Sequence, residues 1–88
     1  MCKTVKQYMS TIIYYDIIST EEDENTFSYG VKSYFQGEEN STDKTKFNMI
    51  QKLTSSFDDI NSFVCFLCEQ HILPIHLQDC AYDYFDMQ

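Results

Sequence analysis

The chain has 88 residues, with 14 acidic side chains against six lysines and no arginine, so its formal net charge is −8. Nucleic-acid binders neutralise phosphates with Lys and Arg, so this charge argues against direct DNA or RNA binding and favours a protein partner with a basic surface. Hydrophobic residues make up 43% of the chain, which is enough for one small domain spanning residues 1–88. No apolar run reaches the ~20 residues that cross a bilayer, and no signal-peptide core is present, so we expect a cytoplasmic protein without a membrane partner.

The first half of the sequence has the composition of β-strands. Residues 5–18 are rich in Ile and Tyr on both parities, which indicates a strand covered on both sides or one that bends part-way. Residues 20–25 are polar and acidic, and they predict a turn. Residues 27–35 alternate cleanly, with Phe27, Tyr29 and Val31 among the residues on one face, so a hairpin with a loop of roughly six residues is predicted.

A third strand and two helices follow. Residues 47–54 predict the strand, with Phe47, Met49 and Leu53 on one face. Ser55 or Ser56 then has the spacing of a helix N-cap, and apolar residues recur with helical periodicity over residues 57–71. A proline in the first turn predicts a second helix over residues 74–86.

This order of elements, β-β-β-α-α, predicts an α+β fold. We expect a three-stranded antiparallel sheet covered on one face by a C-terminal helical hairpin. Leu67, Leu77 and Phe35 are expected to meet in its dry interior.

The C-terminal third resembles an uncharacterised family of small proteins from Gram-positive bacteria, some of which could be carried by phages. Such proteins have a Ser-Ser or Ser-Thr cap, a helix ending near a Cys, and a Leu-x-Pro-Ile-His-Leu-x-Asp opening to a last helix. The matching residues here are Ser55, Ser56, Cys68, Leu73, Pro74, Ile75, His76, Leu77, Asp79, Asp83 and Phe85. Leu73 directly precedes Pro74, which departs from the motif. The resemblance implies a fold and no activity.

Two groups of acidic residues are candidate partner-binding sites. They are Glu21, Glu22, Asp23 and Glu24 in the hairpin, and Asp79, Asp83 and Asp86 on the last helix. Carboxylates arranged in this way could mimic phosphates and occupy a basic groove. The alternative is an acidic surface that only keeps the protein soluble.

A second candidate surface is the uncovered face of the sheet. Ile12, Tyr14, Ile18 and Tyr34 are expected to share it, and such a face is too apolar to remain exposed to water. It would serve as a docking surface or as the seam of a homodimer.

The remaining candidate is a cluster of metal-ligand types. Cys65, Cys68 and His71 follow a C-x2-C-x2-H pattern, and Cys80 could add a ligand from the second helix. On a continuous helix the first three spread over about 240° of arc and do not converge on one ion. We therefore expect no metal and no cofactor, and the cysteines to be small buried side chains.

These observations favour a non-enzymatic interaction module, since no nucleophile, base and orienting group occur together. Its sharpest form is a phage or mobile-element inhibitor that occupies a basic groove of a host defence or regulatory complex. The alternatives are a metal- or thiol-dependent protein using Cys65, Cys68, His71 and Cys80, and a housekeeping homodimer.

Overall fold

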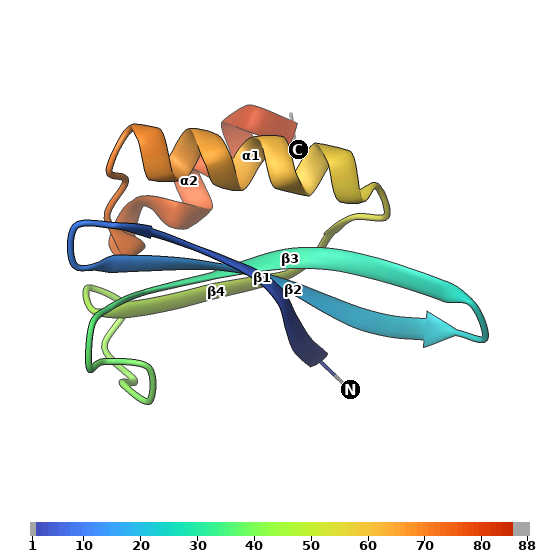
Figure 1. The fold of residues 1–88 in the computed structure, drawn as a ribbon, viewed down its shortest axis with the longest axis horizontal. Helices are drawn as coiled ribbons and strands as arrows, with labels where there is room; N and C mark the ends of the chain where they lie inside the picture. The colour runs from blue at the N-terminus through green and yellow to red at the C-terminus, as the bar shows by residue number, and fades with distance from the viewer. Residues whose placement is uncertain (1, 86–88) are drawn as a thin grey trace.

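The computed structural model describes residues 2–85 and shows a four-stranded sheet with a helical layer on one face (Figure 1). The antiparallel sheet has the strand order β1-β2-β3-β4, so each hairpin joins neighbouring strands. The elements are β1 (Cys2–Ser10), β2 (Ile13–Asp23), β3 (Thr26–Phe35), β4 (Phe47–Thr54), α1 (Phe57–Glu69), the 3₁₀ turn η1 (Pro74–His76) and α2 (Leu77–Phe85). The α+β prediction is confirmed, whereas the prediction of three strands is wrong.

The extra strand arises within residues 5–18, which form two strands rather than one. The chain reverses at Thr11 and Ile12, where Thr11 takes a φ of 56°, and Ser10 then pairs with Ile13. Tight hairpin turns usually carry Asn or Gly at positive φ, because a β-branched residue is strained there. The Ser-Thr-Ile-Ile sequence carries no such signal. Neither interpretation, a strand covered on both sides or one that bends part-way, included this reversal of the chain.

The second hairpin has a shorter loop than predicted. β2 continues through the acidic residues to Asp23, and β3 starts at Thr26, so only Glu24 and Asn25 form the turn. Asn25 has a φ of 66°, a conformation that Asn tolerates better than most residues. The acidic residues therefore lie mostly on a strand instead of in a flexible loop.

β4 contains a bulge that changes which face its side chains occupy. Its pairing with β3 shifts between Ile50 and Thr54, and Lys52 has a φ of 59°. Leu53 packs against the hydrophobic core as a result, while Phe47 lies beside Tyr34 on the opposite face. The prediction that Phe47, Met49 and Leu53 share a face is wrong for Leu53.

α1 begins where predicted and ends earlier. The Ser56 side chain accepts a hydrogen bond from the Asp59 backbone N–H at 3.2 Å, so of the two candidate serines Ser56 is the N-cap. The helix ends at Glu69 rather than at residue 71. His71 takes a φ of 52° there, and its backbone N–H donates to the Cys68 carbonyl oxygen.

The last helix starts with the 3₁₀ turn and becomes an α-helix only at Leu77. Leu77 and Ala81 are fully buried, whereas Leu73 and Tyr84 are exposed. The predicted end at residue 86 lies outside the described residues.

A single apolar core joins the two layers. Leu67 and Leu77 belong to it and Phe35 packs against it, as expected from the sequence. Its buried members are Ile13, Tyr15, Ile17, Val31, Ile60, Phe63, Val64, Leu67, Leu77 and Ala81. Since β2 alternates, Tyr14, Asp16 and Ile18 face away from the helices.

Hydrogen bonds from the strands hold the helical layer in place. Tyr15 Oη donates to the Ile72 carbonyl oxygen at 2.7 Å, and Asn48 Nδ2 donates to the Pro74 carbonyl oxygen at 3.0 Å. Both side chains are buried, so these bonds satisfy polar groups that would otherwise be costly in the core. They fix α1 and α2 over one half of the sheet, and the β2–β3 turn extends beyond the first turn of α1 (Figure 1).

Candidate functional site

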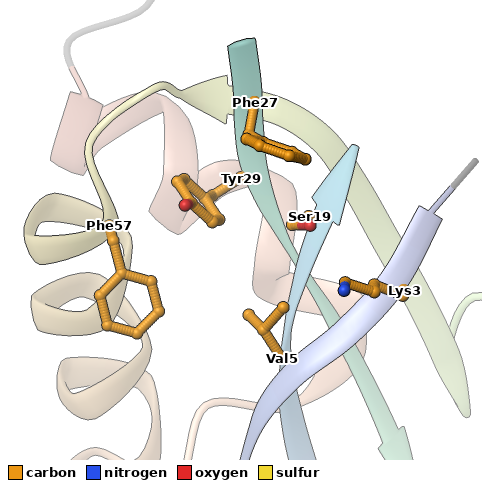
Figure 2. A pocket seen from close by; sticks show the side chains of 6 residues that line it. All are labelled: Lys3, Val5, Ser19, Phe27, Tyr29 and Phe57. Atoms are coloured by element: carbon orange, nitrogen blue, oxygen red, sulfur yellow. The ribbon is translucent and has the colours of Figure 1, made fainter. Parts of the chain in front are cut away.

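An apolar hollow lies where the sheet extends beyond the helices. Figure 2 shows its side chains around a common space between the first turn of α1 and the strands β1 to β3. Its volume is about 310 Å³. The apolar hollow is lined by Lys3, Val5, Ser19, Phe27, Tyr29 and Phe57. Val5, Phe27 and Phe57 are 41%, 42% and 38% exposed, so large apolar side chains face solvent together here.

Local features of the sequence place these side chains. Val5 lies at a bulge, since the pairing of β1 with β2 shifts between Thr4 and Lys6. Phe57 is the first residue of α1, directly after the Ser56 cap. Its ring meets the Tyr29 ring edge-on at a centroid distance of 5.5 Å, so β3 and α1 together form one wall.

Acidic residues adjoin the lining of the apolar hollow, one in space and others along the chain. Glu21 lines an adjoining hollow of about 270 Å³ that shares Lys3, Ser19 and Phe27 with the first. Asp58 and Asp59 follow Phe57 in the first turn of α1 and are exposed. Asp58 lies about 100° round the helix from Phe57, whereas Asp59 lies about 200° away, on the opposite side of the helix. We therefore call Glu21 and Asp58 the acidic rim. Neither forms an ion pair with another residue in the range 2–85.

Glu22 differs from its neighbours because it is already engaged. It accepts a hydrogen bond from Ser28 Oγ at 2.7 Å, and Lys52 Nζ lies 3.4 Å from its other oxygen. The hydrogen bond from Ser28, followed by the charge of Lys52, lowers the pKa of the Glu22 carboxyl below its usual value. Its charge is therefore partly neutralised within the sheet.

The two predicted acidic groups do not form one surface. Residues 21–24 are exposed at the end of the β2–β3 hairpin, whereas Asp79 and Asp83 are exposed on α2, over the other half of the sheet (Figure 1). Asp86 lies outside the described residues. A row of carboxylates running from the hairpin to the last helix is therefore not present among residues 2–85.

The face of the sheet opposite the helices is less available than predicted. Tyr14 and Tyr34 stack there with ring centroids 5.4 Å apart, and Ile18 shares their side of β2. Ile18 and Tyr34 are only 1% and 4% exposed, however. Ile12 lies in the β1–β2 turn and not on a strand, so the expectation that all four share this face is wrong for Ile12.

A polar network occupies the same face. The buried carboxylate of Asp16 accepts hydrogen bonds from Gln7 Nε2 at 2.8 Å and from Tyr34 Oη at 2.9 Å. Lys32 Nζ lies 3.7 Å from it. Burial, followed by the bond to Asp16, raises the pKa of the Tyr34 hydroxyl above its usual value. The centre of this face is thus a satisfied polar cluster rather than an apolar patch.

The candidate metal ligands point to separate partners. His71 Nδ1 contacts the Ser10 hydroxyl, and Cys68 Sγ lies 3.5 Å from the Met9 carbonyl oxygen. Cys80 lines a separate hollow of about 200 Å³ with Phe66, Asp83 and Tyr84, which we call the Cys80 hollow. Within residues 2–85, no group of three or more Cys, His, Asp and Glu is close enough to hold an ion.

Two of the thiols, those of Cys68 and Cys80, are also poorly activated. Burial is the main cause that raises the pKa of the Cys68 and Cys80 thiols above the usual value. A raised pKa reduces the thiolate fraction at neutral pH, and the thiolate is the reactive form. The described geometry offers no support for the alternative based on metal or thiol chemistry.

Sequence reasoning placed Phe27 and Tyr29 together on one face of their strand, and both line the apolar hollow. Alternation identifies the face of a strand and carries no information about where the covering helix begins. Val5 and Phe57 were not singled out as site residues, because each lies at the end of a predicted element.

No helix in the range 2–85 has the length and apolar character to cross a membrane.

Comparison with known proteins gives a family and no activity. No curated protein matches the chain, and no solved structure matches it. A family model matches residues 1–87, a range that includes every strand and helix of the fold. The chain belongs to this family of unknown function, DUF6514.

Proposed function

We propose that the protein is a non-enzymatic interaction module that binds a protein partner with a basic surface. The observation that supports this proposal is the pairing of the apolar hollow with the acidic rim at the end of the sheet that the helices leave uncovered. Protein interfaces have this composition, with an apolar centre that excludes water and charged groups around it.

The charges define the kind of partner. The chain has a net charge of −8, and the carboxylates of Glu21 and Asp58 have no cationic partner in the range 2–85. Opposite charge on the partner accelerates association and selects among partners. In its most specific form, the protein acts in the cytoplasm as a phage or mobile-element inhibitor that occupies the basic groove of a host complex.

The proposal is tested by capturing partners from a lysate of the source cell. We expect the captured protein to be lost at high salt, since exposed ion pairs are screened. The double variant Glu21→Lys with Asp58→Lys should lose it even at low salt. The matched control is Asp79→Lys with Asp83→Lys, which makes the same change of charge and also alters one carboxylate in the first turn of a helix.

The control should retain the partner. Capture that is insensitive to salt, or that is lost equally in both double variants, would contradict binding through the acidic rim. The second result would indicate general attraction by the acidic surface.

A further inference from the structure

We propose, on the basis of the function proposed above, that the apolar hollow seats one large apolar side chain from a short basic segment of the partner. Lysines or arginines on either side of this anchor residue pair with the acidic rim. The partner is thus recognised through a short linear segment, with one apolar residue between basic residues, rather than through a wide complementary surface.

The size of the hollow indicates a single anchor. Pockets for small molecules span about 300 to 1,000 Å³, and this one is at the lower limit, with about 310 Å³. Its walls are formed by Val5, Phe27, Tyr29 and Phe57, from three different elements that the core holds in place. A hollow of this size suits one side chain, and preformed walls reduce the entropy that binding costs.

The charges indicate what surrounds the anchor. Glu21 lines the adjoining hollow on the strand side, and Asp58 follows Phe57 in the first turn of α1 on the helix side. An apolar side chain seated between them brings its neighbours in the segment close to both. Lys3 is the one cationic side chain of the lining and has the wrong sign for such a segment.

The Cys80 hollow provides an internal comparison. It is lined by Phe66, Cys80, Asp83 and Tyr84 and measures about 200 Å³, with a single carboxylate in its lining. Phe66 is 39% exposed, close to the 42% of Phe27. Substituting either Phe with Ala removes a ring of similar exposure, so the two variants differ mainly in the hollow that they alter.

The probe is a synthetic peptide, acetyl-Gly-Lys-Lys-Leu-Lys-Lys-Gly-amide, titrated into isotope-labelled protein while backbone amide chemical shifts are recorded. We expect the largest shifts at Val5, Phe27, Tyr29 and Phe57. A peptide with Gly in place of Leu should bind about five-fold more weakly, since the apolar contact is lost. A peptide with Glu in place of every Lys should not bind.

Variants of the protein complete the test. Phe27→Ala should weaken the Leu peptide about five-fold, Phe66→Ala should leave its affinity unchanged, and Lys3→Glu should strengthen it. Val5→Ala is a second variant that alters the lining of the hollow, and it should also weaken binding of the Leu peptide. Each variant is required to have the circular dichroism spectrum of the native protein. Equal binding of the Leu and Gly peptides, or the largest chemical-shift changes at Phe66 and Tyr84, would overturn the proposal that the anchor residue binds in the apolar hollow.

The failure of this inference differs from a failure of the proposed function. Suppose that the protein binds the Leu and Gly peptides equally while salt-sensitive capture through the acidic rim persists. In that case the hollow does not bind an apolar anchor residue, and the proposed function as an interaction module is retained. If that capture is absent, the proposed function itself is wrong.

Discussion

At the scale of single residues, Gly30 shows how closely the strands approach one another. It lies on β3 opposite Ile18, where β4 passes over it at the bulge. A Cβ atom at this position would lie 2.8 Å from Gln51 Cα and would also overlap the Ile50 carbonyl oxygen. These are backbone atoms, which cannot rotate away as a side chain could, so this position requires glycine.

We therefore expect Gly30→Ala to lower the free energy of unfolding by about 3 kcal/mol, at the upper end of what overpacking costs. Gly37→Ala is the control, since a Cβ atom at Gly37 would have no neighbouring atom within 4 Å and only the φ of 86° opposes a side chain there. The control should cost about 1 kcal/mol. Urea unfolding measures the free energy of unfolding of both variants. Equal losses of this free energy would contradict the close approach of the β4 backbone to Gly30.

At the scale of elements, the two ends of α1 are stabilised in different ways. Ser56 caps its N-terminus, with Asp58 and Asp59 near the positive end of the helix dipole. At the C-terminus the Ile72 backbone N–H donates to the Leu67 carbonyl oxygen, which with the His71 bond completes a Schellman motif. Glycine is usual where His71 stands. A histidine side chain here reaches the Ser10 hydroxyl and so ties the helix end to β1.

This contact predicts coupling between Ser10 and His71. In a double-mutant cycle with Ser10→Ala and His71→Ala, the two losses of unfolding free energy should fail to add by about 1 kcal/mol. His71→Gly should cost less than His71→Ala, because glycine tolerates positive φ. Strict additivity in thermal or urea unfolding would mean that the side-chain contact does not contribute to stability.

At the scale of the whole molecule, the apolar hollow follows from the different lengths of the two layers. A strand rises roughly 3.3 Å per residue and a helix 1.5 Å, so the 11 residues of β2 extend roughly 36 Å and the 13 residues of α1 roughly 20 Å. One helix cannot cover the full length of such a strand. The residues at the uncovered end, among them Phe27, keep an apolar face without a covering helix.

The buried hydroxyls predict how stability changes with pH. Burial raises the pKa of the Tyr15 hydroxyl, and burial together with Asp16 raises that of Tyr34. A raised pKa in the folded state means that the unfolded chain loses these protons first. Stability is therefore complete below the unfolded tyrosine pKa of about 10 and is lost as the pH rises above it.

We expect the free energy of unfolding in urea to decrease steeply between pH 9 and about pH 11, with the Cys68 and Cys80 thiols contributing at the lower end. Tyr15→Phe should be less stable at pH 7, because the bond to the Ile72 carbonyl oxygen is lost, and should show a weaker dependence on pH. An unfolding free energy that is constant across this range would contradict the burial of both hydroxyls.

The sequence by itself determined the order of elements from residue 27 onward, a helix cap at Ser55 or Ser56, and a core that includes Leu67 and Leu77. These features depend on periodicity and on local hydrogen bonds, which neighbouring residues settle among themselves. The turn at Thr11 and the bulge at Lys52 could not be read in this way. Both place a non-glycine residue at positive φ, and only pairing with adjacent strands compensates such strain.

Some features of the candidate site also follow from the sequence, and others depend on the tertiary structure. Charge and the hairpin acids were evident from composition, and the face of Phe27 and Tyr29 followed from alternation. The exposure of Phe27, and the meeting of Phe27 and Tyr29 with Val5 and Phe57, were decided only by the tertiary structure. The physical reason is that exposure depends on where a layer from the other half of the chain ends, and no local pattern in a strand records the length of the helix that covers it.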